Sequence, residues 1–304
     1  MAAPVSDLDV FDRRLLRLRR DRAAARESDA RFLFDEVADR LMDRLSLVKR
    51  QFPVVLDMGA ATGGLSASLA SRAGTVLVVG MDMSPRMAQH LPRPAFVADE
   101  DFLPLRPASV DAVVSNLALH WVNDLPGALL QVKSALKPDG LFLAAMLGGE
   151  SLRELRDCLM TAELAVTGGA SPRVSPFIDP RDMGGLMQRA GFALPVVDSD
   201  MITVDYAHAF KLMHDLRAMG AANATHNRLH RPTRRAVLME AARLYHEKYA
   251  NADGLIPATF QVVYAIGWRP HESQPQPLKP GSATHRLADA LATVELPAGE
   301  KTGR

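Results

Sequence analysis

The stretch that decides the fold runs Val54-Val55-Leu56-Asp57-Met58-Gly59-Ala60-Ala61-Thr62-Gly63-Gly64. It begins with a short apolar run, passes through a glycine-rich turn and continues into a helical pattern that carries Leu65 and Leu69. Glycine in such a turn lets the backbone take positive φ and lets a ligand approach the main chain closely. The stretch therefore predicts a buried strand, a ligand-binding turn and the start of a helix.

Similar apolar, β-branched runs recur along the chain with helical segments between them, at residues 75–80, 95–98, 110–114 and 141–147. Continuous apolar runs of this kind are typical of strands that are buried on both faces, and hence of a parallel sheet. Two later runs, at 196–206 and 260–268, have the same character. We therefore predict a doubly wound α/β fold.

The spacing of the glycines argues against a dinucleotide site. Such a site has G-x-G-x-x-G at the N-terminus of the helix, whereas Gly59 and Gly63 form G-x-x-x-G. Asp57 stands two residues before the first glycine, and its carboxylate would repel a pyrophosphate. A carboxylate there suits a ligand with an ammonium and a sulfonium, such as S-adenosylmethionine.

Three more polar residues follow predicted strands. Asp82 ends the second strand, where a carboxylate can accept both ribose hydroxyls. Asp99 follows the third strand, in position for an adenine amino group, and Asn116 ends the fourth. Each residue alone has an ordinary explanation as a turn or a helix cap. Because ligands bind outside the carboxyl ends of such strands, the residues together predict a site for S-adenosylmethionine.

These residues resemble the class I S-adenosylmethionine-dependent methyltransferases over about residues 50–148. Residues 56–63 look like the first motif of that family, and 98–105 look like its adenine segment. The family has a glycine where Ala61 stands, and the added methyl group is expected to crowd the methionine part of the ligand. The resemblance implies a Rossmann-like class I methyltransferase fold. It also implies these cofactor-binding residues: Asp57, Gly59, Gly63, Asp82, Met83, Asp99, Glu100 and Asn116.

A closer resemblance covers about residues 10–285. The stretches that carry it are Phe11-Asp12-Arg13, Ala98-Asp99-Glu100, residues 119–126 (LHWVNDLP), Ser175-Pro176-Phe177 and Ile266-Gly267-Trp268. They look like the methyltransferase-fold assembly factors of mitochondrial respiratory complex I. This resemblance implies a protein substrate, a complex I (NADH dehydrogenase) subunit, and hydroxylation of an arginine rather than methylation. The chain is also similar, more distantly, to the malonyl-carrier-protein methyltransferase of biotin synthesis.

The residues themselves leave the reaction open. Methyl transfer needs in-line positioning, desolvation and sometimes a base. Hydroxylation needs an oxygen-activating centre, and a non-haem iron site takes two histidines and a carboxylate. The sequence has no His-x-Asp or His-x-Glu pair, and His226 and His230 fall in a predicted loop, so we predict no metal ligands. Residue chemistry thus favours methyl transfer, whereas the closer resemblance favours hydroxylation.

His120 and Trp121 lie just after the fourth predicted strand, beside the expected methyl group. His120 is a candidate catalytic base or orienting donor, and Trp121 is a candidate substrate contact. The alternative is a packed aromatic ring next to a satisfied histidine. Tyr206 is a further candidate substrate contact, with core packing as its alternative.

An arginine-rich helix is predicted over residues 13–22, with Phe11, Leu15 and Leu18 at helical spacing. Its arginines have three explanations: a solvated face, a cap over the active site that contacts an acidic partner protein, or an RNA-binding surface. The net charge favours the first, because 36 Lys and Arg against 35 Asp and Glu leave only +1. We therefore predict no nucleic-acid partner.

The chain is predicted to have an N-terminal helical cap over 1–50 and a methyltransferase-fold domain over 51–270. A helical insertion at about 206–250 is placed to form a lid, and a flexible tail follows over 271–304. Ser151 and Glu154 form a predicted capping box at the start of one helix. A predicted turn over 137–140 leads from another helix into the fourth main apolar run.

The amino-acid composition excludes several classes of protein. The 304 residues are 48% apolar and 23% charged, which is ordinary for a globular protein and excludes wholesale disorder. Cys158 is the one cysteine, so an internal disulfide is excluded. No apolar run approaches the ~18 residues of a membrane span, and none is expected.

The first 31 residues are rich in Arg and Ala, as transit peptides are, but acidic residues that include Asp7, Asp9, Asp12 and Asp21 interrupt them. This favours a bacterial cytoplasmic protein, with the mitochondrial matrix, at the inner membrane, expected for a eukaryotic counterpart. Three functions stay open: an arginine-modifying enzyme of complex I assembly, a methyltransferase for a protein or a small or carrier-linked acid, and a non-enzymatic assembly factor. The departure at Ala61 favours the last.

Overall fold

The computed structural model describes residues 9–25, 29–275, 282 and 286–294. Its contacts divide the chain into two units, Met1–Pro270 and His271–Arg304. The described part of the second unit includes a short helix, α10 (Leu287–Ala290). The predicted flexible tail lies mostly outside the described residues. The division of the first unit into a cap, a main domain and an insertion stays a prediction.

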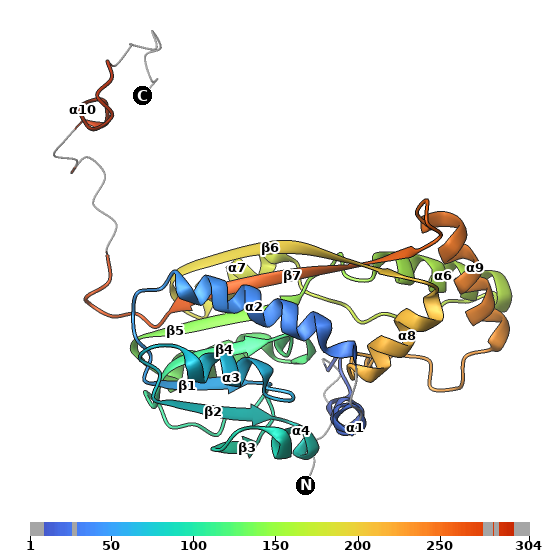
Figure 1. Cartoon of the computed structure of the whole chain (residues 1–304), viewed down its shortest axis with the longest axis horizontal. Coiled ribbons are helices and arrows are strands. Elements are labelled where there is room, and N and C mark those ends of the chain that lie inside the picture. The colour runs from blue at the N-terminus through green and yellow to red at the C-terminus, as the bar shows by residue number, and fades with distance from the viewer. Residues whose placement is uncertain (1–8, 26–28, 276–281, 283–285, 295–304) are drawn as a thin grey trace. The chain divides into compact units, whose positions relative to one another are not determined.

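Within the described residues, the first unit is built on one seven-stranded sheet in the order β3-β2-β1-β4-β5-β7-β6 (Figure 1). The strands are β1 (Val54–Met58), β2 (Leu77–Asp82), β3 (Ala95–Val97), β4 (Val110–Asn116), β5 (Leu136–Leu147), β6 (Ala193–Tyr206) and β7 (Ile256–Trp268). The first five strands run parallel, and β7 is antiparallel to both β5 and β6. The predicted doubly wound α/β fold is confirmed.

The central strands form because their side chains are apolar on both faces. Leu56 of β1, Val113 of β4 and Phe142 of β5 are completely buried. Burying such a side chain stabilises the fold by about 1.5–3 kcal/mol relative to leaving it exposed. The parallel register brings the carboxyl ends of β1, β2 and β4 to one edge of the sheet, which is where ligands bind in folds of this kind.

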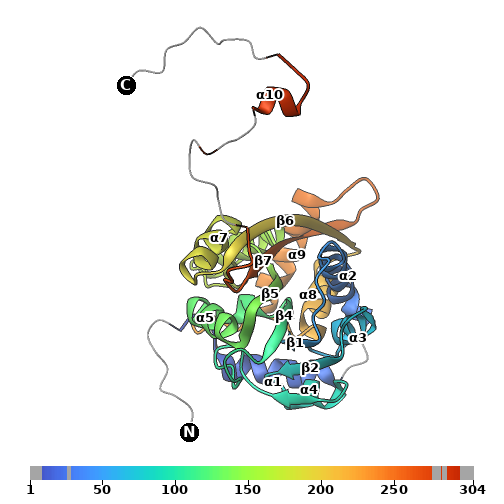
Figure 2. The same ribbon diagram turned by 90° about the vertical axis from the view of Figure 1, so that its left-hand side faces the viewer.

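Helices cover both faces of the sheet (Figure 2). One layer contains α2 (Phe32–Ser46), α3 (Gly64–Ser71), α6 (Arg153–Thr167), α8 (Ala209–Ala218) and α9 (Arg235–Tyr249). The other contains α5 (Leu125–Ala135) and α7 (Pro180–Arg189). The helices α1 (Arg13–Ala24) and α4 (Pro85–His90) pack against each other. Two short 3-10 helices, Asp29–Arg31 and Leu119–Trp121, complete the unit.

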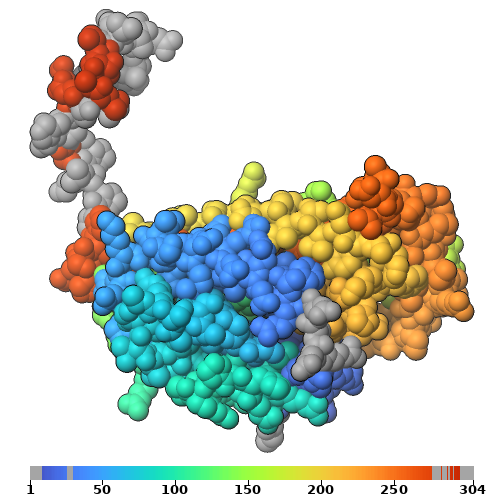
Figure 3. Space-filling model, viewed as in Figure 1, coloured from blue at the N-terminus to red at the C-terminus, as the bar shows by residue number. Residues whose placement is uncertain are grey.

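Charged side chains tie α2 to the outer strand β6. Arg44 lies 3.0 Å from Asp198 and 3.2 Å from Asp200, and Arg40 lies 3.3 Å from Asp200. The two segments lie side by side on the molecular surface (Figure 3). These pairs are exposed, so each contributes little to stability. They nevertheless fix the first layer of helices against the far edge of the sheet.

The apolar stripe predicted for the first helix is wrong. Helix α1 buries Leu16, Arg20 and Ala23, whereas Leu18 is 45% exposed. Phe11 precedes the helix and forms a β-bridge with Thr225. The inward face of α1 is set by Arg20, because that side chain meets buried carboxylates, as described below.

The predicted capping box at the start of α6 is also wrong. The residue before the helix is Leu152, at φ +55°, and it makes no side-chain cap. The Ser151 hydroxyl donates to the carbonyl of Gln261, and the Glu154 carboxylate accepts from the Thr259 hydroxyl at 2.6 Å. Both side chains therefore bind strand β7 instead of the helix end. The predicted turn over 137–140 lies inside β5, where the pairing register shifts.

Candidate cofactor and active site

A cavity of about 100 Å³ lies at the carboxyl ends of β1, β2 and β4. Its walls come from the glycine turn after β1, from α1 and α2, from the 3-10 helix Leu119–Trp121, and from residues 218–221 of the predicted insertion. We call its two polar ends the Asp57 end (Asp57 and Asn116) and the Asp82 end (Asp82 and Arg20). Typical small-molecule sites measure ~300–1,000 Å³, so this cavity is small.

The structure brings half of the predicted cofactor residues to this cavity. Those that line it are Asp57, Gly59, Asp82 and Asn116. Those that lie outside its wall are Gly63, Met83, Asp99 and Glu100. Of the substrate candidates, His120 and Trp121 line the cavity and Tyr206 does not.

The glycine turn is held in the left-handed region of backbone space. Gly59 and Gly63 have φ of +74° and +85°, and a Cβ on Gly59 would collide with the Cβ of Ala118. Ala61 has φ +49°, a conformation that costs a residue with a Cβ about 1–2 kcal/mol. Its backbone N–H donates to Asp82 Oδ2 at 3.1 Å. The glycine that the family has at this position would adopt the same turn without that cost.

The Asp57 end presents two buried acceptor atoms. Asp57 is completely buried, and its Oδ2 accepts from the Ser66 hydroxyl at 2.5 Å. Asn116 donates from Nδ2 to the carbonyl of Phe34 at 2.9 Å. Among the described residues, neither Asp57 Oδ1 nor Asn116 Oδ1 has a hydrogen-bond partner. Since unpaired buried acceptors are costly, this end of the cavity suits a ligand that carries N–H donors and a positive charge.

Burial raises the pKa of Asp57 to about 7, although the hydrogen bond from Ser66 acts in the opposite direction. The carboxyl group is therefore partly protonated near neutral pH. A cationic ligand beside Asp57 Oδ1 would favour the ionised form. An ammonium group fits this end of the cavity both by hydrogen bonding and by charge.

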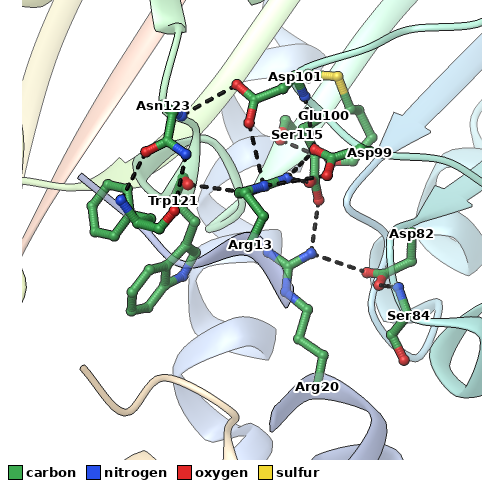
Figure 4. Close-up of polar contacts among 12 residues, drawn as sticks. Arg13, Arg20, Asp82, Ser84, Asp99, Glu100, Asp101, Ser115, Trp121 and Asn123 are labelled. Atoms are coloured by element: carbon green, nitrogen blue, oxygen red, sulfur yellow. Dashed lines mark hydrogen bonds and ion pairs between the residues drawn. The ribbon is translucent and has the colours of Figure 1, made fainter. Parts of the chain in front are cut away.

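The Asp82 end is filled by the protein itself. Asp82 is 1% exposed, and its Oδ1 accepts from the backbone N–H of Ser84 at 2.8 Å. Arg20 Nη1 lies 2.7 Å from Glu100 Oε1 and 3.7 Å from Asp82 Oδ2 (Figure 4). Glu100 is completely buried. The two carboxylates thus share one guanidinium from α1.

A second arginine of α1 binds the acidic segment after β3. The Arg13 guanidinium pairs with Asp99 and Glu100, and lies 3.3 Å from Asp101. It also donates to the carbonyl of Trp121 at 2.9 Å (Figure 4). Burial raises the pKa of Glu100, but Arg20 and Arg13 more than reverse this, and the pKa falls to about 2. Glu100 is therefore ionised and held by both arginines.

His120 is better suited to donate a hydrogen bond than to act as a base. Its ring is 8% exposed, and Nδ1 accepts from the backbone N–H of Leu147 at 3.4 Å. Burial, together with the charge of Arg20, lowers its pKa to about 3. The ring is therefore neutral at physiological pH, with its proton on Nε2. Trp121 packs on Phe11 with ring centroids 5.4 Å apart, in a cluster that also buries Met83 and Leu16.

Tyr206 lies in the main hydrophobic core among residues of α8 and α9, and burial raises its pKa to about 12. It does not reach the cavity because β6 ends beneath these helices. His226 and His230 lie in an irregular loop, where a ring nitrogen of His230 contacts the His226 carbonyl. In the described part of the chain, no cluster of three or more His, Cys, Asp or Glu side chains is arranged to hold a metal ion.

A second hollow, the outer groove, was missed by the sequence analysis. It has a volume of about 280 Å³ and an apolar lining from α6, α8 and α9, with Phe177 in its wall. Four arginines border it: Arg19, Arg173, Arg217 and Arg228. The Phe177 ring also packs on His120, with centroids 5.7 Å apart. The outer groove therefore adjoins the cavity, and Ala221 lines both.

The strand order and the glycine turn at the end of β1 define a class I methyltransferase fold. The structure resembles a methyltransferase from Bacillus halodurans with a TM-score of 0.54 and 14% identity, over 77% of this chain and 99% of the other. It also resembles a phosphoethanolamine N-methyltransferase from Haemonchus contortus, solved with S-adenosylhomocysteine, with a TM-score of 0.51 and 15% identity, over 84% and 60%. The family model described as a methyltransferase domain matches residues 29–195.

Curated relatives match nearly the whole chain. Human arginine-hydroxylase NDUFAF5 is 43% identical over 97% of this chain and 87% of its own length, and the zebrafish protein is 41% identical over 93% and 89%. A malonyl-[acyl-carrier protein] O-methyltransferase from Methylovorus is 35% identical over 87% and 92%. The chain belongs to the methyltransferase-domain family. In the described residues, no helix is both long and apolar enough to cross a membrane.

Proposed function

We propose that this chain binds S-adenosylmethionine in the cavity and hydroxylates an arginine of a respiratory complex I (NADH dehydrogenase) subunit during assembly. Dioxygen supplies the inserted oxygen atom, its second atom leaves as water, and an external reductant supplies two electrons. The reaction is taken from relatives named arginine-hydroxylase, which are 41–43% identical over 84–89% of their length. The observation that supports the ligand is the pair of unpartnered acceptors, Asp57 Oδ1 and Asn116 Oδ1. The relatives are named mitochondrial; a bacterial cytoplasmic location for this chain is part of the proposal.

The residues of the cavity have distinct roles in this proposal. Asp57 and Asn116 accept N–H groups from the ligand's ammonium. Gly59 lets the ligand approach the main chain, because a side chain there has no room. The neutral His120 can donate from Nε2 to a backbone carbonyl of the substrate, because an arginine side chain offers no acceptor, and it orients the substrate instead of removing a proton. When bound, S-adenosylmethionine supplies a sulfonium-activated methyl group.

A second candidate function is O-methyl transfer to a carrier-linked acid. It is favoured by the relatives named malonyl-[acyl-carrier protein] O-methyltransferase, at 35–39% identity over 85–87% of this chain. The outer groove offers apolar walls for an acyl chain and Arg217 for a carboxylate, because Arg19, Arg173 and Arg228 already bind groups of this chain. In this function the sulfonium-activated methyl group is the group transferred.

The variant Asp57→Ala tests whether the ligand site serves the function. It is expected to abolish S-adenosylmethionine binding in calorimetry, because it removes the buried charge that faces the ammonium. In cells whose only copy is this variant, the arginine modification and complex I assembly are expected to fall together. Arg17→Ala, on the exposed outer face of α1, is the matched control. Lost binding with normal assembly would favour a non-enzymatic assembly factor.

A further inference from the structure

Two arginines of α1 face the same way. Arg13 and Arg20 are seven residues apart, which is two helical turns, so both point from α1 toward the carboxyl ends of the strands (Figure 4). Between them they contact Asp82, Asp99, Glu100 and Asp101. Of the other arginines of α1, Arg14, Arg17 and Arg22 are exposed, and Arg19 donates to backbone carbonyls instead. The pairing is thus a property of one helix face.

The inward face of α1 places Arg20 at the Asp82 carboxylate, which is the group that the ribose of a nucleoside would bind. A ribose hydroxyl must come within about 2.7 Å of a carboxylate oxygen to form a hydrogen bond. Asp82 and Arg20 both line the cavity, and Arg20 Nη1 lies 3.7 Å from Asp82 Oδ2, where a ribose hydroxyl would have to come. The space left is about 100 Å³, well below the ~300–1,000 Å³ of typical small-molecule sites. Among the described residues, the acceptor atoms at the Asp57 end are unpartnered, whereas the carboxylate at the Asp82 end is already paired with Arg20.

Helix α1 is also held by Asp21, which accepts from the Ser84 hydroxyl at 2.5 Å, and by Arg19, which donates to the carbonyls of Ala222 and Asn223. Its apolar contribution is the small cluster of Phe11, Leu16, Met83, Trp121 and Ala224. The Asn123 side chain exchanges two hydrogen bonds with the backbone of Phe11, and the backbone N–H of Asp12 donates to Ala224. The ion pairs with Glu100 and Asp82 are the buried charged contacts of α1. Breaking such a pair leaves a buried charge unpaired unless another group takes its place.

We propose that Arg20 is a positioning residue that competes with the ribose of the cofactor for Asp82 and Glu100. Binding of the nucleoside half therefore requires α1 to move away, whereas binding of the amino-acid half does not. This inference rests on the proposed cofactor. Once α1 moves, Arg13 and Arg20 leave together, and the ribose hydroxyls replace the Arg20 guanidinium at Asp82 and Glu100. Occupancy of the cofactor site and the position of α1 are then linked.

Calorimetry on the full chain tests this with two ligands, S-adenosylhomocysteine and methionine. Arg20→Gln removes the competing charge and is expected to lower the Kd for S-adenosylhomocysteine at least tenfold. The Kd for methionine is expected to stay within about twofold, because methionine has no ribose. Arg17→Gln, at an exposed position of the same helix, is expected to match the wild type for both ligands. Equal or weaker binding of S-adenosylhomocysteine by Arg20→Gln overturns the inference.

Limited trypsin digestion of the wild-type chain gives an independent measurement that does not depend on a variant folding. S-adenosylhomocysteine is expected to speed cleavage after Arg14 and Arg17 several-fold, because α1 leaves the body of the protein. Slower cleavage in its presence would show that α1 closes over the ligand, and would overturn the inference. If neither protein binds S-adenosylhomocysteine while methionine binds, the proposed cofactor and this inference both fail. Binding without any change in α1 overturns the inference alone.

Discussion

At the scale of single residues, Asp57 is the side chain on which the proposed ligand site depends. It is completely buried, one oxygen is satisfied by Ser66, and the other is unpartnered among the described residues. A buried carboxyl group in that state is a costly arrangement for a protein that binds nothing there. The same features make it a good acceptor for an ammonium group, because ionisation and hydrogen bonding are gained together on binding.

The raised pKa of Asp57 predicts a pH dependence of binding. Because the pKa is about 7 in the free protein, a cation must displace a proton below that pH. The Kd for S-adenosylhomocysteine is therefore expected to fall about fivefold from pH 6 to pH 7 and about tenfold from pH 6 to pH 8, and to level off above pH 8. Calorimetry in buffers of different ionisation enthalpy measures the proton released. Asp57→Asn should bind weakly and show a flat profile; a flat profile in the wild type would contradict this assignment.

Sequence spacing located the residues of the Asp57 end well, because Asp57, Gly59 and Asn116 are fixed by strand ends and a glycine turn. At the other end it placed Asp82 in the cavity wall correctly, but it failed for Asp99 and Glu100 for a physical reason. Whether Glu100 and Asp99 face a ligand or another residue depends on what packs above them, and here that is α1. The spacing of Arg13 and Arg20 on one helix face was a signal that could have revealed this.

At the scale of elements, the strands were the most predictable part of the fold. Their apolar runs are long enough to identify buried strands, and the observed bounds differ by only a few residues, as for β2, which begins at Leu77. Helix ends were harder. A polar residue at a helix start can bind the helix or a neighbouring strand, and Ser151 and Glu154 bind β7. Local spacing does not reveal which of these partners is present.

The contact between α6 and β7 can be measured. Glu154→Ala leaves the Thr259 hydroxyl and N–H without their acceptor in a buried site, so unfolding free energy is expected to fall by about 2 kcal/mol. A double-mutant cycle with Thr259→Val in urea denaturation is expected to show about 1 kcal/mol of coupling. The matched cycle with Ser151→Ala should show almost none. Strong coupling between Ser151 and Glu154 would contradict these contacts with β7 and would support the predicted capping box.

At the scale of the whole molecule, the described residues combine a family fold with features of their own. The sheet order is that of class I methyltransferases, and the relatives of nearly full length are named either as arginine-hydroxylases or as O-methyltransferases. The small cavity, the arginines of α1 and the outer groove lie at one edge of one sheet. The fold therefore fixes where chemistry occurs, while the reaction itself depends on the substrate that reaches this edge.

Whether this chain hydroxylates or methylates an arginine is tested most directly by the mass of the substrate after the reaction. The purified protein would be incubated with S-adenosylmethionine, oxygen, a reductant and a candidate complex I subunit, and the subunit measured intact and as peptides. The account predicts a gain of about 16 Da on one arginine, the mass of one oxygen atom. It also predicts no gain with Asp57→Ala and a full gain with Arg17→Ala. A gain of about 14 Da, the net mass of a transferred methyl group, would contradict the proposed hydroxylation and establish methyl transfer.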